Sequence, residues 1–509
     1  MHRLSSMSLA IAALSVSLAA AGAFAAALPA TVTNALRDAG IPQDSVSVVV
    51  QEAGAGAVGT PLVDHRGDAP MNPASVMKLV TTFVALEWLG PAFTWKTEAW
   101  IDGPLVDGVL DGNLTIKGYG DPKITLENFW LMLREMRQKG LREIRGDLVL
   151  DRSYFAARGH DPGRFDEQPL RAYNVGPDAL LVNFKTVRFI LSPDPDQRRV
   201  NVRAEPPLPG LTIRNQLKLT ATECGDWKGS TRGGFTSNGD TADASFTGTY
   251  AIACGEQSWY VSLLDHPGYA GATFRSLWSE AGGTLGGKAR EGTASAGARL
   301  FVTQTSPQLA EIVRDINKFS NNVMARQLFL TLDAQANGPP ATSDRAAATV
   351  KEWLRKRGLA FRELVMENGS GLSRIERISA AHLNQLLQSA YASPVMPEYI
   401  SSFALTAVDG TMKRRLLGTG AAGQAHIKTG TLDGVRALAG YVLDAHGRRW
   451  TVVGMVNHPN AGNAGAALDA LVQWVAAGPD GEPQRSQQKL EKPDKPQKPR
   501  PTTRQRQRP

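Results

Sequence analysis

The 509-residue sequence predicts an α/β protein in which an antiparallel sheet flanked by helices is interrupted by a large, mainly β insertion. The segment "NPASVMKLVTTFVALEWLG" from Asn72 is apolar on nearly every side, which is typical of a buried helix. From Trp95 to about Ser295, short β-like runs are separated by Gly, Pro and Asp. Near the end, "HIKTGTLDGVRALAGYVL" predicts two strands around an Asp433-Gly434 turn, and "RRWTVVGMVNH" predicts a third.

The N-terminal end predicts an export signal over residues 1–25. A short positive start is followed by an Ala/Leu-rich run, which ends in the small-x-small cleavage signature Ala23-Phe24-Ala25. An uncleaved membrane anchor is the alternative. Because no later stretch reaches the roughly 18 unbroken apolar residues of a spanning helix, the mature chain is expected outside the cytoplasmic membrane, in the periplasm.

The net charge of +8 is concentrated at the C-terminal end. Residues 479–509 hold nine Lys/Arg and four Asp/Glu, a net of +5, and they lack aromatic residues. Such a Pro-, Gln- and Lys-rich segment cannot bury enough apolar surface to fold, so a disordered tail is expected. The tail is either merely solvated or in weak contact with an anionic membrane or wall surface. The rest of the chain carries only +3 and no basic stripe, which argues against nucleic-acid binding.

The insertion is expected over residues 96–295, with a Thr/Gly-rich β lobe at 200–261 that holds Cys224 and Cys254. In an exported chain these two cysteines suggest one disulfide, with two free thiols as the alternative. Two cysteines without a nearby histidine do not make a zinc shell, so no metal is expected. Two glycine-rich segments, "GAGAVG" and "GGTLGGKA", lack the helix start or the final hydroxyl residue of a nucleotide loop, and no cofactor is expected.

Ser75 and Lys78 stand at the start of the apolar helix. They follow Pro73, a residue favoured at helix starts, and residues three apart on a helix share a face. The positive end of the helix dipole would stabilise negative charge that develops on the serine. Burial among Val76 and Phe83 would lower the pKa of the lysine, which makes it usable as a base. The pair therefore predicts a serine nucleophile that is activated without histidine.

Two more motifs follow in order along the chain. Ser320 and Asn322 lie at the break between two helical patterns, where a hydroxyl and an amide can project into a cleft. Lys428-Thr429-Gly430 lies on a predicted strand, where the glycine allows another backbone to approach. In this order S-x-x-K, S-x-N and K-T-G form the signature of serine enzymes that recognise penicillin.

With these motifs the sequence resembles the class C low-molecular-mass penicillin-binding proteins, the exported D-alanyl-D-alanine carboxypeptidase/endopeptidases. The likeness covers most of residues 26–477, and 242 residues separate the first two motifs, which is typical of the family's insertion. It implies a β-lactamase/transpeptidase-like catalytic domain built from residues 26–95 and 296–478. One departure is Asn368, where the family usually has aspartate. The likeness is carried by "PASVMKLVTT", "INKFSNNVMARQLF", "NGSGLSRIERIS", "AVDGTMKRRL" and "IKTGTLDGVRALAGYV".

The resemblance implies a catalytic role for five residues. Ser75 attacks the carbonyl between two D-alanines, and Lys78 takes its proton. Ser320 and Lys428 pass a proton to the leaving amine, and Asn322 holds the substrate amide. The expected activity is serine D-alanyl-D-alanine carboxypeptidase, endopeptidase or both, through an acyl-enzyme that penicillin also forms.

Four further residues are expected to bind the substrate. Thr431 and the nucleophile supply the backbone N–H groups of the oxyanion hole. Thr429, together with the strand lysine, binds the terminal carboxylate. Gly430 lets the peptide lie alongside the strand as an added strand. Asp151, in the insertion, binds the free amino group of a diaminopimelate side chain.

Peptidoglycan stem peptides and β-lactam inhibitors are the partners that these expectations imply. Two other classes of protein share part of the pattern. A β-lactamase would use the same nucleophile and release the acyl-enzyme quickly, but the long insertion disfavours it. A non-catalytic wall-binding protein would keep the fold and lose a motif, whereas all three motifs are intact.

Overall fold

The computed structural model of the protein describes residues 27–54, 59–156 and 159–479. The predicted signal peptide and the predicted tail from residue 480 onward lie outside this part of the chain. Among the helices of the described residues, none has the length and apolar content that crossing a membrane requires.

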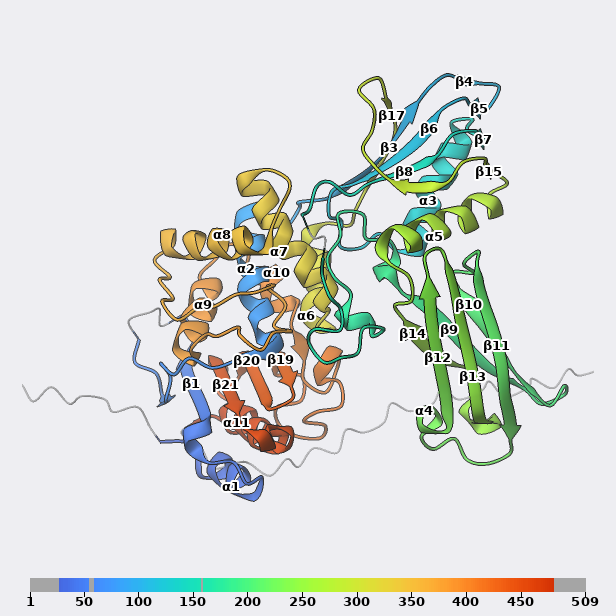
Figure 1. Ribbon diagram of the computed structural model, residues 1–509. Helices are drawn as coiled ribbons and strands as arrows, with labels where there is room; N and C mark the ends of the chain where they lie inside the picture. The colour runs from blue at the N-terminus through green and yellow to red at the C-terminus, as the bar shows by residue number, and fades with distance from the viewer. Residues whose placement is uncertain (1–26, 55–58, 157–158, 480–509) are drawn as a thin grey trace, which may run out of the picture.

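A six-stranded antiparallel sheet forms the centre of the main body, which comprises residues 27–95 and 306–479. The predicted hairpin around Asp433-Gly434 is confirmed, and the third predicted strand pairs with it. Among the described residues the first strand lies beside the last, so segments about 400 positions apart (from Val46 to Val456) meet in one sheet (Figure 1). In order across the sheet the strands are β18 (Ala404–Leu405), β19 (Ala425–Leu432), β20 (Val435–Leu443), β21 (Arg449–Asn457), β1 (Val46–Glu52) and β2 (Val63–His65).

Side chains alternate between the two faces of this sheet, and each face packs on different helices. On β1, Val49 belongs to one apolar cluster, whereas Val48 and Val50 belong to the cluster on the other face. The Val49 face is covered by α2 (Lys78–Leu89), α6 (Leu309–Lys318), α7 (Asn322–Asn337), α8 (Ser343–Lys356), α9 (Ala380–Tyr391) and α10 (Met396–Ser401). The other face is covered by α1 (Ala30–Asp38) and α11 (Gly465–Ala477).

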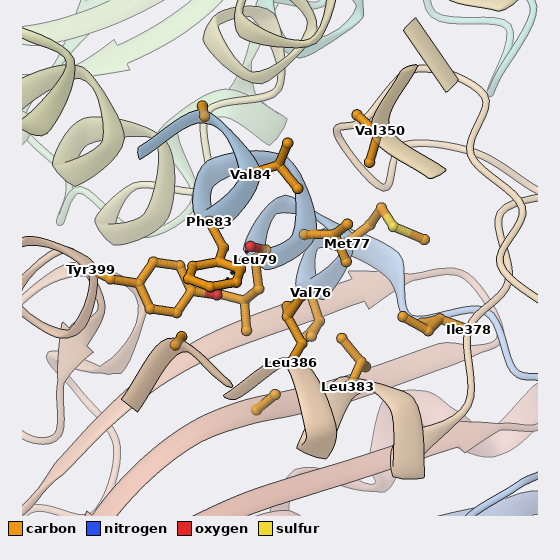
Figure 2. Packing of buried hydrophobic residues seen from close by; sticks show 14 of the residues in the cluster. Val76, Met77, Leu79, Phe83, Val84, Val350, Ile378, Leu383, Leu386 and Tyr399 are labelled. Atoms are coloured by element: carbon orange, nitrogen blue, oxygen red, sulfur yellow. Dashed lines mark hydrogen bonds between the residues drawn. The ribbon is translucent and has the colours of Figure 1, made fainter. Parts of the chain in front are cut away.

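The apolar helix that the sequence predicts from Asn72 is α2, and it lies inside the larger cluster. Its Phe83 is 1% exposed, and the ring lies 5.4 Å from that of Tyr399. Figure 2 shows Val76, just before α2, next to Leu386 of α9. Burying each such side chain contributes roughly 1.5–3 kcal/mol to folding. Packing on all sides therefore fixes the N-terminal end of α2, where the candidate site residues lie.

The inserted region, residues 96–305, begins with a five-stranded sheet. The prediction ended the insertion at residue 295, which is too early, because β17 lies beyond that point and pairs antiparallel with β3. Two helices that the sequence analysis did not predict, α3 (Leu126–Gln138) and α5 (His266–Glu280), belong to its core. The sheet order is β16 (Ala289–Glu291), β8 (Leu148–Asp151), β6 (Asn113–Gly118), β3 (Lys96–Asp102), β17 (Arg299–Thr305); a small sheet holds β15 (Thr284–Leu285), β7 (Glu143–Ile144), β5 (Val109–Leu110) and β4 (Leu105–Val106).

A second β unit in the inserted region holds both cysteines. It contains more than the predicted range 200–261, because β9 precedes that range and pairs with two of its strands. Its core contains Phe189, Phe246 and Tyr250. The short α4 (Trp227–Ser230) lies between two of its strands. Its sheets are β10 (Arg199–Glu205), β9 (Val187–Asp194) and β14 (Gln257–Val261), and β11 (Leu211–Thr220), β13 (Thr241–Ala251) and β12 (Thr231–Asn238).

Cys224 and Cys254 form a disulfide across a sequence separation of 30 residues. Closing a loop of this length removes conformations of the unfolded chain that correspond to about 3–4 kcal/mol. We expect the Cys224→Ser/Cys254→Ser double variant to lose about this much unfolding free energy in denaturant titrations under non-reducing conditions. An unchanged unfolding midpoint, or free thiols at both positions in mass spectra of the non-reduced protein, would contradict this assignment.

Candidate active site

Ser75 lies in a 3₁₀ turn, η2 (Ala74–Met77), and α2 begins only at Lys78. The sequence predicts both residues within one helix, so the local structure differs from the prediction. The tighter turn keeps their predicted proximity, because side chains at i and i+3 eclipse in a 3₁₀ turn. Lys78 Nζ donates a hydrogen bond to Ser75 Oγ at 3.0 Å.

Two glycines allow other parts of the chain to reach the Ser75 turn. A Cβ at Gly430 on β19 would stand 2.5 Å from the Pro73 carbonyl oxygen. A Cβ at Gly371, whose φ is +78°, would stand 1.9 Å from the Ala74 carbonyl oxygen. Each position therefore requires glycine. The close backbone approach expected at Gly430 is thus made by this chain itself, at the turn that carries Ser75.

Lys78 is fully buried, and three oxygen atoms surround its amine. Besides Ser75 Oγ, Nζ donates to Asn322 Oδ1 at 2.7 Å and to the Ser370 carbonyl oxygen. These acceptors match the three donors of a lysine ammonium and hold the amine beside the serine hydroxyl. Ser75 lies in η2, Asn322 in α7, and Ser370 in the loop that follows Val365. Segments far apart in the sequence therefore complete the arrangement.

The pKa of Lys78 lies well below its usual value, chiefly because burial disfavours the charged amine. The positive charges of Lys428 and Arg326 lower it further, and the carboxylate of Glu376 opposes them. A buried lysine with a depressed pKa is neutral in a larger fraction of molecules, and the neutral amine can accept a proton.

Glu376 shapes the loop that touches Lys78. Its Oε1 accepts hydrogen bonds from the backbone N–H groups of Glu367, Asn368 and Gly369, at 3.0, 3.0 and 3.1 Å. The side chain is fully buried, and Oε2 has no hydrogen-bond partner among the described residues. Burial raises the pKa of this carboxyl group, and Lys78 counteracts that effect. The carboxylate thus anchors the turn that presents the Ser370 carbonyl to the lysine amine.

Ser320 lies at the break between α6 and α7, as the sequence predicts, and its backbone is in the left-handed region with φ of +56°. Asn321 caps α7, because its side chain accepts the Met324 N–H at 3.1 Å. This cap holds the S-x-N turn at the start of the helix. Asn322 is the first residue of α7 and turns its amide oxygen toward Lys78.

Lys428 connects the second motif with the third. From β19 its Nζ donates to Ser320 Oγ at 2.9 Å and to the Thr429 carbonyl oxygen at 2.7 Å. Burial lowers the pKa of this lysine to about 7. Near neutral pH the amine is therefore poised between its two protonation states, which suits a group that passes protons.

The edge of β19 is only partly covered. The two-residue strand β18 pairs with His426 and Ile427, and within the described residues no strand pairs with that edge from Lys428 onward. Thr429 and Thr431 lie along this segment, where their hydroxyls contact Thr411 at 2.8 Å and Arg436 at 2.7 Å, respectively. An extended peptide can pair with such a free edge as an added strand.

The structure does not place Asp151 with the other predicted site residues. It ends β8 in the inserted sheet and is 1% exposed; its carboxylate accepts bonds from Ser153 and lies 3.5 Å from Lys117 Nζ. Tyr154, three residues after Asp151, accepts a hydrogen bond from Gln335, which lies near the end of α7 that is far from Asn322. At 1.5 Å rise per residue, about 20 Å of helix separates the two ends. The geometry therefore does not support amine binding by Asp151.

Sequence reasoning missed several groups beside the cluster. Arg326 and Glu376 are buried charges that act on Lys78, and neither belongs to the three catalytic motifs, although both lie in segments that carry the family likeness. The carbonyl oxygen of Tyr173, in the inserted region, accepts a bond from Asn322 Nδ2 at 3.5 Å, and its hydroxyl donates to Asp166 at 2.7 Å. Asp166 of the inserted region therefore contacts the side chain of Tyr173, the residue whose backbone carbonyl lies beside Asn322.

The chain is similar to named carboxypeptidases over most of its length. The D-alanyl-D-alanine carboxypeptidase of an Actinomadura strain is 30% identical over 431 residues, which are 81% of this chain and 78% of the relative. The D-alanyl-D-alanine carboxypeptidase DacB of Haemophilus influenzae is 24% identical over 424 residues, 79% of this chain and 84% of the relative.

A solved structure supports the fold. The crystal structure of penicillin binding protein 4 from Haemophilus influenzae superposes with a TM-score of 0.71 at 22% identity, over 87% of this chain and 99% of the other. A sequence model of the D-Ala-D-Ala carboxypeptidase 3 (S13) family matches residues 28–477. The chain belongs to this family, which places it among the class C low-molecular-mass penicillin-binding proteins.

Proposed function

We propose that the protein hydrolyses the bond between two D-alanine residues of peptidoglycan peptides through an acyl-enzyme on Ser75, with Lys78 as the base. The observation that carries the assignment of these roles is the contact of Ser75 Oγ with a buried lysine amine at 3.0 Å. No histidine takes part in it. Family membership makes the chain a serine-type peptidase, and the proposal concerns how its residues do the work.

In the first step Ser75 Oγ attacks the carbonyl carbon, and the neutral Lys78 amine takes the hydroxyl proton. The new C–O bond leaves a negative charge on the former carbonyl oxygen. The backbone N–H groups of Ser75 and Thr431 would stabilise it. The close passage of β19 supports this role, because a Cβ at Gly430 would lie 3.2 Å from the Ser75 nitrogen.

In the second step the C–N bond breaks and the D-alanine amine leaves with a proton. Ser320 and Lys428 form a hydrogen-bonded pair that can deliver it. Lys428 and Thr429 would also bind the terminal carboxylate of the substrate, an interaction that suits a cation and a hydroxyl. The amide side chain of Asn322 would orient the substrate peptide bond.

Water then attacks the ester: its hydroxyl group joins the acyl carbon, its other proton restores the Ser320–Lys428 pair, and Lys78 returns to Ser75 Oγ the proton that it took in the first step. A β-lactam would acylate the same oxygen, because its strained amide presents the same carbonyl to the same groups. The family acts on the bacterial cell wall, so the chain is an exported protein, and we place it in the periplasm. The predicted export signal supports that compartment.

Mass spectrometry after incubation with benzylpenicillin tests the proposal. We expect a stable penicilloyl adduct on the Ser75 peptide and release of D-alanine from a soluble D-alanyl-D-alanine peptide. Rapid disappearance of the adduct with turnover of the antibiotic would indicate a β-lactamase. No adduct and no D-alanine release would indicate a non-catalytic wall-binding protein.

Glu376→Gln is expected to move the acid limb of the acylation rate to lower pH. The carboxylate raises the pKa of Lys78, whereas burial and the cations Lys428 and Arg326 lower it. Replacing the carboxylate by a neutral amide therefore lowers the pKa of Lys78 further. The lysine is then neutral, and active as a base, at lower pH. Stopped-flow acylation by a fluorescent penicillin across pH measures the shift.

Glu367→Gln is the matched control for this variant. Glu367 lies in the same loop and contacts Ser373, but it is not among the charges that act on Lys78. Its removal should leave the acid limb in place. An acid limb that stays in place or moves to higher pH in Glu376→Gln would refute the electrostatic role of that carboxylate.

A further inference from the structure

A cavity of about 500 Å³ lies beside the second motif, between the main body and the inserted region. One wall is the segment Phe319–Val323 at the α6–α7 break, and the facing wall includes Arg188, Glu205 and Tyr260 from the second β unit. In Figure 1 this unit, with β9 and β14, stands beside the main body on the side of α6. Because Ser320 and Asn322 line the cavity, it is continuous with the catalytic cluster.

Exposed aromatic side chains gather in this cavity. Among the described residues, four large aromatic side chains are substantially exposed: Trp130 at 36%, Tyr173 at 41%, Tyr260 at 53% and Phe319 at 63%. All but Trp130 line this one cavity. Scattered exposed apolar residues need no explanation, but their convergence on a concave site at a domain junction marks a place where a ligand binds.

The charges of the cavity are mostly satisfied within the protein. Arg188 contacts Glu205 at 3.2 Å and donates to Ser258 at 2.9 Å. The remaining polar lining consists of amides and hydroxyls, such as those of Asn183, Asn321 and Thr186, together with the carboxylate of Glu127. A ligand with its own ammonium and carboxylate groups would find few unpaired opposite charges. A neutral ligand with hydroxyl and amide groups around an apolar face fits this lining better.

We propose that this cavity binds a saccharide unit of the glycan strand that carries the substrate peptide. This inference rests on the proposed function. A pyranose ring presents an apolar C–H face to aromatic rings and hydroxyls to the amides and carboxylate around them. A single D-alanine is far too small to fill the cavity, whose volume falls in the range of about 300–1,000 Å³ for small-molecule sites.

The reach of the substrate agrees with this placement. An extended peptide of about four residues spans at most ~14 Å, so a sugar at its origin has to bind within that distance of Ser75. The cavity lies within this reach, because Asn322 lines the cavity and also contacts Lys78 at 2.7 Å. The inserted region would therefore select peptides that are still attached to the glycan.

Tyr260→Ala tests the inference, because this residue belongs to the second β unit and not to the motifs. Two substrates are compared, a pentapeptide ending in D-alanyl-D-alanine and the same pentapeptide attached to its N-acetylated disaccharide. We expect kcat/KM for the disaccharide-linked substrate to fall at least tenfold, while turnover of the free pentapeptide and acylation by penicillin stay within twofold. Phe319→Ala should repeat the pattern from the opposite wall.

Trp130→Ala is the matched control, because it removes the exposed aromatic side chain that does not line the cavity. It should leave both substrates unaffected. Equal losses on both substrates in Tyr260→Ala would assign the cavity to the peptide and overturn the inference, and so would no loss on either. Absence of penicillin acylation in the unmodified protein would instead refute the proposed function, so the two failures are distinguishable.

Discussion

Ser75→Ala is expected to abolish both acylation by penicillin and release of D-alanine. The variant loses Ser75 Oγ, the proposed nucleophile, which contacts the Lys78 amine. Without this oxygen no acyl-enzyme can form. Removal of a serine nucleophile in a comparable enzyme costs about 10⁶-fold in kcat. Intact-protein mass spectrometry and a D-alanine release assay measure the two activities.

The fold should survive this substitution. Ser75 is only half-buried, and Lys78 keeps Asn322 and the Ser370 carbonyl as acceptors. We expect the unfolding free energy to stay within about 1 kcal/mol, the typical contribution of one hydrogen bond. Ser47→Ala, which removes a buried serine on β1 with one hydrogen bond, should retain both activities. Either activity persisting in Ser75→Ala would place the nucleophile elsewhere.

Lys78→Met should be nearly as damaging as loss of the serine. Methionine keeps much of the apolar stem in the buried site but removes the amine that takes the Ser75 proton. General-base catalysis typically contributes about 10²–10⁴-fold, and we expect a loss in this range in the rate of penicillin acylation. The acid limb that reports the protonation of Lys78 should also disappear from the pH profile of the residual rate.

Lys78→Arg separates charge from basicity. Arginine keeps the positive charge, but it cannot lose its proton within the accessible pH range. We therefore expect it to be as inactive as Lys78→Met. A loss below tenfold in the acylation rate of either variant would contradict the role of Lys78 as the base. Lys428 would then become the candidate base.

The features that were predictable from sequence are mostly local. The contact of Ser75 with Lys78 follows from a three-residue spacing, which both kinds of helix preserve. The hairpin turn at Asp433-Gly434 and the helix break at Ser320 have turn and capping signals in adjacent residues. These signals act over a few positions, so one sequence is enough to detect them.

The features that escaped prediction depend on contacts between distant segments. β17 has ordinary strand character, and only its pairing with β3 assigns it to the inserted sheet. Glu376 lies in "NGSGLSRIERIS", a segment that carries the family likeness, but the segment does not reveal its role, which depends on a loop that folds over its carboxylate. The separation of Asp151 from the catalytic cluster also depends on distant contacts, since its position along the chain does not reveal that β8 leads toward the far end of α7.

The pairing of β1 with β21 has a consequence for how the protein matures. The partners of Lys78 are 244 and 292 positions further along the sequence, and the sheet that supports them is completed by strands near the C-terminus. A nascent chain lacks those strands, so its lysine remains hydrated and keeps an ordinary basicity. Contacts between such distant segments also slow folding, so the chain stays unfolded for longer, as export of an unfolded chain across the membrane requires. Ser75 therefore becomes a reactive nucleophile only after the strands near the C-terminus have crossed the membrane and paired in the sheet.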